Sequence, residues 1–218
     1  MSLFTLFSNP LVFILWIVSV LVALSVHEFS HALAANFLGD QTAKRMGRLT
    51  LNPFAHVDLF GLLALVFVHF GWGKPVPYNP NYVKYRHWGE VLIALAGPVS
   101  NLILLVISAL LLKGFAPALG WNNYLIVFLG FSFFINAALM LFNLIPLPPL
   151  DGSKLLFAIL HENKWFTLRR QIEQYGPWVL MGLILVDITL GVGIISLVLN
   201  KPLYWILKIF DLQSVFAL

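Results

Sequence analysis

Cysteine is absent from the 218-residue chain, and charged residues are scarce, because Asp, Glu, Lys and Arg together make up only 10% of it. The lack of cysteine excludes disulfides, thiolate metal sites, iron–sulfur clusters and a cysteine nucleophile, so any metal must be held by His and carboxylate groups. Soluble domains carry about 25% charged and about 45–50% apolar residues. This chain is 60% hydrophobic. The composition therefore places it in a lipid bilayer and excludes an ordinary cytosolic enzyme and a disordered protein.

Basic side chains outnumber acidic ones by 13 to 9, which gives a formal net charge of +4. In membrane proteins such an excess is typical of cytoplasmic loops near anionic lipid, so we expect the lipid bilayer as a partner and no nucleic acid. The length corresponds to about one domain, and the sequence contains no internal repeat or low-complexity run. We predict a single membrane-embedded domain over residues 1–218, and the composition leaves its oligomeric state open.

Four apolar segments are candidates for membrane-spanning helices. The first follows Ser8 or Asn9, either of which can cap a helix with Pro10 at its first position, and its apolar run covers Leu11–Val26. No basic residue precedes this run and no small-residue cleavage pattern ends it, so we expect it to be retained rather than removed as a signal peptide. The other three candidates are Val91–Leu112, Tyr124–Phe142 and Gly176–Leu199.

Two further apolar segments are too short or too amphipathic for a simple crossing. Leu59–Phe70 is followed by the Gly- and Pro-rich stretch Gly71–Pro77, which predicts extended or turning chain. We predict that residues 59–80 re-enter the membrane and leave on the same side. Leu203–Leu218 is amphipathic, which favours a position in the interface. The predicted fold is an all-α polytopic membrane protein with about four transmembrane helices, a re-entrant β-hairpin or loop and a C-terminal amphipathic segment.

The distribution of basic residues supports the re-entrant segment. If residues 59–70 do not cross, ten basic residues lie on one side of the membrane and three on the other. The ten are Lys44, Arg45, Arg48, Lys74, Lys84, Arg86, Lys154, Lys164, Arg169 and Arg170, and the three are Lys113, Lys201 and Lys208. The positive-inside rule then predicts a multi-pass protein of the cell membrane whose ten-residue side faces the cytoplasm. A crossing segment would divide the basic loops almost evenly.

The first apolar helix continues without a break into His27-Glu28-Phe29-Ser30-His31. Residues four apart lie on one helix face, so His27 and His31 can bind a single metal ion with Glu28 beside them. Zinc suits this pattern, since catalytic zinc takes three protein ligands and a water whose proton a nearby carboxylate accepts. The alternative is a chance motif. A charged residue at membrane depth costs about 2.5–3.5 kcal/mol, so three ionisable residues in five favour a metal site with Glu28 as the base.

A third zinc ligand is expected from a distant segment at the same depth. Asp151 follows three prolines that break the helix predicted from Tyr124, and irregular backbone at membrane depth is tolerated where it lines a cavity or is buried. With a re-entrant 59–70 segment, this helix and the first one end on the same side, so Asp151 can reach the two histidines. Three rivals lie in a loop that looks interfacial, namely Asp40, His56 and Asp58.

Taken together, these features resemble the site-2 protease family of intramembrane zinc metalloproteases. The resemblance covers about Leu21 to Leu156. It rests on HEFSH at 27–31, the proline-rich segment 143–152 that ends in Asp151-Gly152, Gly97-Pro98-Val99-Ser100-Asn101, Leu51-Asn52-Pro53, and Gly73-Lys74-Pro75-Val76-Pro77. It implies zinc bound by His27, His31 and Asp151, with Glu28 as catalytic base. Unlike larger members, the chain has no recognisable PDZ or CBS insertion.

The resemblance also implies roles near the active site. The family places an asparagine corresponding to Asn101 where it contacts substrate or the developing oxyanion; the alternative is a helix–helix hydrogen bond made possible by close approach at Gly97. Asn136 and Asn143 are predicted to be structural. The segment 71–80 is expected to form a hairpin whose edge pairs with an extended substrate, or else a loop that seals the cavity.

The predicted function is an intramembrane endopeptidase that hydrolyses peptide bonds within or near transmembrane segments of other proteins, as in regulated intramembrane proteolysis. Three alternatives remain. One is an ion or proton transporter that uses buried His, Glu and Asp residues, although the inverted repeats typical of transporters are missing. Another is a catalytically silent membrane scaffold, and the third is a zinc peptidase of another family with a different third ligand. Asp187, in the last predicted span, is interpreted as a neutral, hydrogen-bonded carboxyl group.

Overall fold

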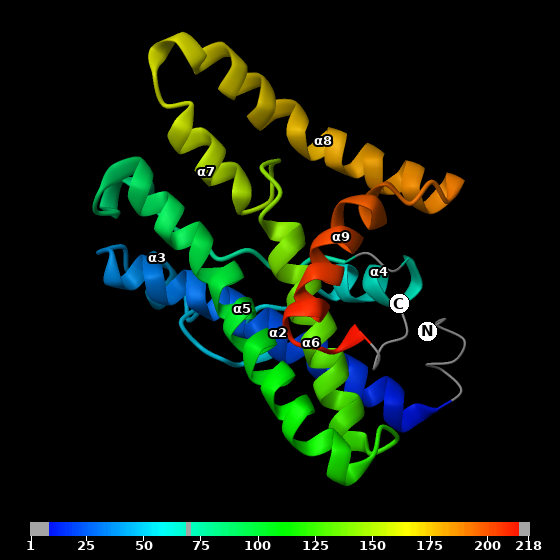
Figure 1. Cartoon of the computed structure of the whole chain (residues 1–218). Helices are drawn as coiled ribbons and strands as arrows, with labels where there is room; N and C mark the ends of the chain where they lie inside the picture. Colours follow the sequence, from blue (N-terminus) through cyan, green and yellow to red (C-terminus); the bar gives the residue numbers. More distant parts are fainter. Residues whose placement is uncertain (1–8, 69–70, 214–218) are drawn as a thin grey trace.

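Three long helices form the centre of the computed structural model, which describes residues 9–68 and 71–213 (Figure 1). They are α2 (Pro10–Phe37), α5 (Arg86–Leu119) and α6 (Tyr124–Asn143), and all three pack against one another. Each is long and apolar enough to cross a membrane, and among the described residues no other helix meets that criterion. The chain is therefore a multi-pass helical membrane protein. The first three spans predicted from the sequence are confirmed, with α5 extended at both ends.

Helix α2 begins as its sequence predicts. The side-chain oxygen of Asn9 accepts hydrogen bonds from the backbone N–H groups of Leu11 at 3.1 Å and Val12 at 3.3 Å, and Pro10 occupies the first helical position. The helix then runs unbroken through His27 and His31 to Phe37. Both histidines are thus carried by a membrane-spanning helix, as predicted.

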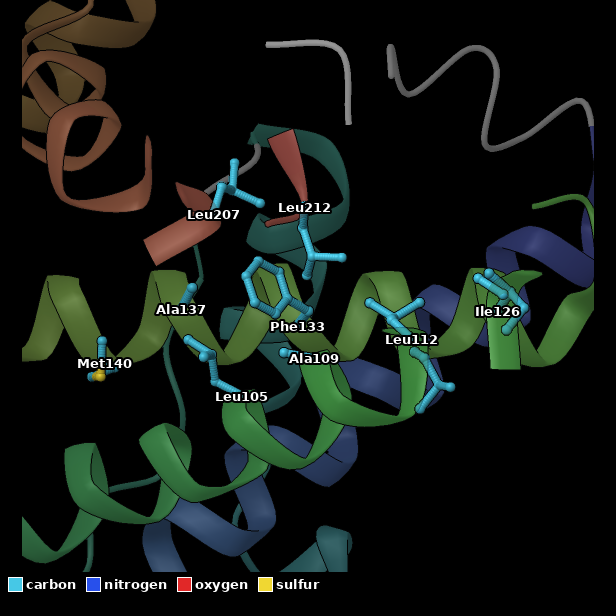
Figure 2. Packing of buried hydrophobic residues seen from close by; sticks show 11 residues of the cluster. Leu105, Ala109, Leu112, Ile126, Phe133, Ala137, Met140, Leu207 and Leu212 are labelled. Carbon is cyan, nitrogen blue, oxygen red and sulfur yellow. The ribbon is translucent and has the colours of Figure 1, made fainter. Parts of the chain in front are cut away.

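The largest buried apolar cluster among the described residues lies between α5 and α6. Only residues 120–123 connect these two helices, so α6 folds back along α5. Figure 2 shows the α5 side chains facing those of α6, with Leu207 and Leu212 packed over them. The labelled residues of this cluster are Leu105, Ala109, Leu112, Ile126, Phe133, Ala137, Met140, Leu207 and Leu212. This packing holds the two helices in fixed register, and the buried Asn101 and Asn136 lie on the same two helices within one turn of it.

The segment between α2 and α5 contains a short helix, α4 (Leu59–Val68), whose ten residues extend only about 15 Å. After it the chain returns to its starting point, because Val57 and Gly73 form an isolated antiparallel bridge and the Lys74 N–H donates to the His56 carbonyl at 2.7 Å. Gly61 permits this return, since a Cβ there would lie 2.0 Å from the Trp72 carbonyl oxygen. The described residues contain no β-strand, so the predicted β-hairpin is not confirmed; residues 69 and 70 of that segment lie outside the description.

The predicted fourth span over Gly176–Leu199 is not confirmed, because no single helix covers it. Helix α8 covers Phe166–Leu190, and a separate helix, α9, covers Ile194–Ile209. The break occurs because Gly191 and Gly193 adopt positive φ angles of 62° and 73°, a conformation that ends a helix and that glycine tolerates best. The predicted tail 203–218 begins inside α9, and its residues 214–218 lie outside the described part. Figure 1 shows α8 at the edge of the molecule, beyond the three-helix centre.

The remaining elements are short and connect the long helices. They are α3 (Thr42–Arg45), α7 (Gly152–Ile159) and the 3₁₀ turns Pro53–Ala55, Pro80–Tyr82 and Asn163–Trp165. Helix α7 follows the proline-rich turn after α6 and packs against α5. This contact brings the start of α7 back over the helix centre.

Candidate active site

His27, His31 and Asp151 converge on one point. The two histidines lie one turn apart on α2, with side-chain Nε2 atoms 3.0 Å from each other, and both residues are buried. Asp151 precedes α7, and its Oδ2 lies 3.2 Å from Nε2 of His27 and 3.3 Å from Nε2 of His31. Among the described residues this is the one group of three or more His, Asp or Glu side chains with suitable atoms close enough to hold a metal ion. The sequence-predicted trio is thus brought together.

The other ring nitrogens of the histidines show how this point is organised. Nδ1 of His27 donates to the Asn101 side-chain oxygen at 2.6 Å, and Nδ1 of His31 donates to the Ile93 carbonyl at 2.7 Å. Because both acceptors are carbonyl oxygens, each ring carries its proton on Nδ1 and directs the Nε2 lone pair toward the shared point. Both imidazoles are therefore oriented by α5 in the tautomer that a metal ligand requires.

The convergence fits a zinc ion. Two ligand atoms, each at about 2.0–2.1 Å from a tetrahedral zinc, lie about 3.3 Å apart, which is close to the three separations observed here. The Asp151 Oδ2 atom is buried and has no hydrogen-bond donor among the described residues. Burying an unsatisfied carboxylate oxygen beside two nitrogen lone pairs is costly without a cation to compensate.

Gly97 allows α5 to pass directly over the two imidazoles. A Cβ at this position would lie 2.5 Å from Nε2 of His31 and 2.6 Å from Cε1 of His27. Even alanine would therefore push into the rings at the face where their Nε2 atoms converge. Steric exclusion therefore explains why the Gly97–Asn101 motif begins with glycine, and it shows that α5 lies directly against the site.

Asn101 is fully buried among three helices. Besides accepting from His27, it donates from Nδ2 to the Asn136 side-chain oxygen at 2.8 Å and to the Ala23 carbonyl at 3.3 Å. Asn136 in turn donates to the Ser132 carbonyl at 2.8 Å. The amide of Asn101 is thus engaged by α2 and α6, and its geometry favours the helix–helix alternative over direct contact with substrate. Asn143 donates to the Leu139 carbonyl of its own helix at 3.0 Å.

Glu28 lies next to His27 on α2 and is 8% exposed. Its place on the helix, one residue after one ligand candidate and three before the other, keeps it in the same buried turn without joining the three-atom group. This is the placement that the sequence predicts for a base that is not itself a ligand.

The rival ligands considered from the sequence have other partners. Asp40 is buried, and it accepts hydrogen bonds from Thr42 and from the backbone N–H of Asn79. Burial alone would raise the pKa of its carboxyl group, but the hydrogen bonds outweigh this effect and the pKa is lowered. His56 Nε2 donates to the Thr50 carbonyl, and Asp58 Oδ1 accepts from the Gly61 N–H near the start of α4. None of the three belongs to the converging group. The half-buried Asp187 of α8 does not belong to it either.

Arg48 is a neighbour of the site that the sequence did not single out. It is only 6% exposed, and a terminal nitrogen of its guanidinium donates to the Lys74 carbonyl of the returning chain. In the sequence it is indistinguishable from Lys44 and Arg45, which are exposed in the same loop. No local pattern marks it, because its burial arises from contact with a segment 26 residues away.

Comparison with known proteins gives a consistent assignment. The family model for peptidase family M50 matches residues 117–186, which include Asp151. A Bacillus subtilis protein named "Putative zinc metalloprotease YwhC" is 37% identical over 200 residues, covering 89% of this chain and 90% of its own length. A Mycolicibacterium smegmatis protein named "Putative zinc metalloprotease Rip2" is 38% identical over 151 residues, covering 65% of this chain and 55% of its own length.

No solved structure matches the chain. The coverage of the Bacillus relative is nearly complete in both directions, and the names of both relatives agree with the metal chemistry of the converging side chains. The resemblance seen in the motifs is confirmed: the chain belongs to peptidase family M50, the site-2 protease family, and is a zinc-dependent intramembrane protease.

Proposed function

We propose that this protease is an endopeptidase that cleaves transmembrane segments of other membrane proteins, with His27, His31 and Asp151 as the zinc ligands and Glu28 as the catalytic base. The observation that carries the proposal is the convergence of two Nε2 atoms and one carboxylate oxygen within 3.0–3.3 Å of one another, with both imidazoles on a helix long and apolar enough to cross a membrane. A peptide bond reaches this point only if part of its chain enters the helix bundle.

The protein side chains have separate tasks in this chemistry. When bound, zinc acts as a Lewis acid that lowers the pKa of a coordinated water to about 7 and polarises a carbonyl group. The Glu28 carboxylate accepts the proton of the attacking water and then delivers it to the departing amine nitrogen. Asn101 acts as a positioning residue, since its bond to Nδ1 holds the His27 ring in the required tautomer and orientation.

The substrate must be extended where it is cut, because helical hydrogen bonds shield its peptide groups. The chain from Gly71 to Asn79 forms no helix, and Gly73 approaches Leu24 of α2, which supports the expectation that this stretch pairs with the unwound substrate. The apolar outer face of α2 supports lipid as the surrounding medium. Four of its side chains are at least 40% exposed at helical spacing, namely Leu11, Ile14, Val18 and Val22.

The cleavage proposal is tested with purified protein in detergent or proteoliposomes and a panel of single-span substrates. We expect metal-dependent cleavage within or near the span of at least one substrate, with activity lost on chelation and restored by added zinc. A scaffold would cleave none of them with or without metal. A transporter would instead move ions or protons across proteoliposomes without hydrolysis.

We further propose that the active site opens to the cytoplasm of the cell and that residues 59–80 form a re-entrant segment. The bridge between Val57 and Gly73 supports this, because the chain leaves and returns at one place, and α4 is about half as long as the roughly 30 Å hydrocarbon core. Ten basic residues grouped against Lys113 support the cytoplasmic direction; Lys201 and Lys208 are not counted on the other side, because no fourth span is confirmed among the described residues.

Cysteine labelling tests this orientation, since the chain has no cysteine of its own. Lys44→Cys, Lys84→Cys and Arg170→Cys replace exposed side chains and should all resist a membrane-impermeant thiol reagent on intact cells, whereas the exposed Lys113→Cys should react. Permeabilised cells provide the control, in which all four should label. Labelling of Lys84→Cys on intact cells while Lys44→Cys stays protected would mean that the segment crosses the membrane, which contradicts the proposal.

A further inference from the structure

Arg48 carries an unused hydrogen-bond donor in a buried position. Its Nε–H is inaccessible to solvent and has no acceptor among the described residues, although a terminal nitrogen of the same guanidinium donates to the Lys74 carbonyl. An arginine side chain that is 94% buried normally has its donors satisfied, because an unpaired buried donor costs about 1–3 kcal/mol, and more when charged. The geometry therefore points to an acceptor that arrives from outside the chain.

The position of Lys74 places this donor beside the catalytic turn. The chain at Gly73 touches α2 at Leu24, because a Cβ on Gly73 would lie 2.9 Å from the Leu24 Cδ1 atom. Leu24 and Glu28 are four residues apart on α2 and so share a helix face. Arg48 donates to the next residue along this chain, and its charge acts on the Glu28 carboxylate, so Arg48 lies on the Glu28 side of this turn.

Electrostatics agrees with this placement. Burial lowers the pKa of the Arg48 guanidinium, and the Glu28 carboxylate is near enough to oppose that effect. Arginine stays charged even so, since its ordinary pKa is above about 12. The turn of α2 that carries Glu28 thus has a fixed positive charge near the base.

We propose that the Nε–H of Arg48 binds the carbonyl oxygen of the scissile peptide bond and stabilises the negative charge that develops on it. This inference rests on the proposed function. In the reaction, a C–O bond forms between the water oxygen and the carbonyl carbon, the C–N bond breaks, and Glu28 carries the proton from the water to the leaving nitrogen. Arg48 donates a hydrogen bond throughout and transfers no proton. Its planar fork suits this task because one nitrogen keeps hold of Lys74 while another faces the substrate.

The test compares Arg48→Lys and Arg48→Gln with wild type in the cleavage assay. Lysine keeps the charge and can still hold the Lys74 carbonyl, but it lacks the second fixed donor. We expect both variants to keep wild-type zinc content and thermal unfolding midpoint and to lose about 10²- to 10³-fold in kcat, with KM within about threefold. Arg45→Lys is the matched control, because Arg45 is exposed at the end of α3, three residues before Arg48, and should keep full activity.

Two results would overturn the inference. One is a kcat within about threefold of wild type in either folded variant; the other is a loss of zinc or of thermal stability that accompanies the lost activity in both, which would make Arg48 a structural residue. Glu28→Gln in the same assay separates this inference from the proposed function on which it rests. If Glu28→Gln is inactive while the Arg48 variants are active, only the role of Arg48 fails. If all of them are active, the proposed function fails.

Discussion

Replacing Glu28 by glutamine should abolish peptide-bond cleavage while zinc stays bound. Glutamine has nearly the same shape as glutamate, but its amide cannot accept the proton of the attacking water. Glu28 is buried and lies outside the group of converging ligand atoms, so the change leaves that group intact. Loss of a general base costs about 10²–10⁴-fold in rate, and we expect the upper part of that range because other carboxylates are engaged elsewhere.

The measurement pairs kcat/KM on a cleavable single-span substrate with elemental analysis of the same preparation. Glu162→Gln is the matched control, because Glu162 is 56% exposed in an ion pair with Lys164 and should keep wild-type activity. Zinc content near one ion per chain is expected in all three proteins. Substantial cleavage by Glu28→Gln would remove Glu28 from its role as base, and loss of zinc would make it a ligand instead.

Replacing Asp151 by asparagine should release the zinc and with it the activity. The carboxylate oxygen lies 3.2 and 3.3 Å from the two imidazole nitrogens, and it is the only negative charge in the group of converging ligand atoms. Asparagine preserves the size of the side chain but replaces the anionic ligand with a weak neutral one. Removing a residue that only orients a ligand costs about 10–100-fold in metal affinity, so loss of the ligand itself should cost more than that.

Zinc content after dialysis against a weak chelator is the direct readout for this variant. Asp58→Asn provides the control, since Asp58 accepts a hydrogen bond from Gly61 near the start of α4 and is no part of the converging group. Wild-type zinc in Asp151→Asn would contradict the ligand set. Loss of zinc in a variant of Asp40, His56 or Asp58 instead would favour a peptidase with a different third ligand.

The sequence by itself determined the parts of this protein that depend on local chemistry. Apolar runs long enough for the bilayer specify α2 and α6, and Pro10 after two possible capping residues, Ser8 and Asn9, indicates where α2 begins. The four-residue spacing of His27 and His31 places two imidazoles on one helix face whatever else the chain does. The sequence also predicted that Asp151 approaches the two histidines. If the segment between α2 and α5 re-enters without crossing, α2 and α6 end on the same side of the membrane.

The limits of local reasoning are clearest at the end of the chain. The apolar run from Gly176 to Leu199 has the length of a span, and its hydropathy does not indicate a break at Gly191 and Gly193. The structure ends α8 at Leu190 because both glycines take positive φ angles. Glycine permits that conformation without requiring it. The helix therefore ends there because of tertiary contacts, namely the burial of Leu207 in α9 and Leu212 after it against α5 and α6.

Only the tertiary structure decided which side chains surround the metal site and which atoms they use. The sequence left Asn101 free to contact a substrate, but in the structure its amide is hydrogen-bonded to His27 and Asn136 on two other helices. Gly97 became necessary only where α5 crosses the two imidazoles. Arg48 had no distinguishing pattern, because its burial and its unused donor arise from the returning chain at Lys74. These features are contacts between segments far apart in the chain, and such contacts depend on how helices pack rather than on the residues beside each one.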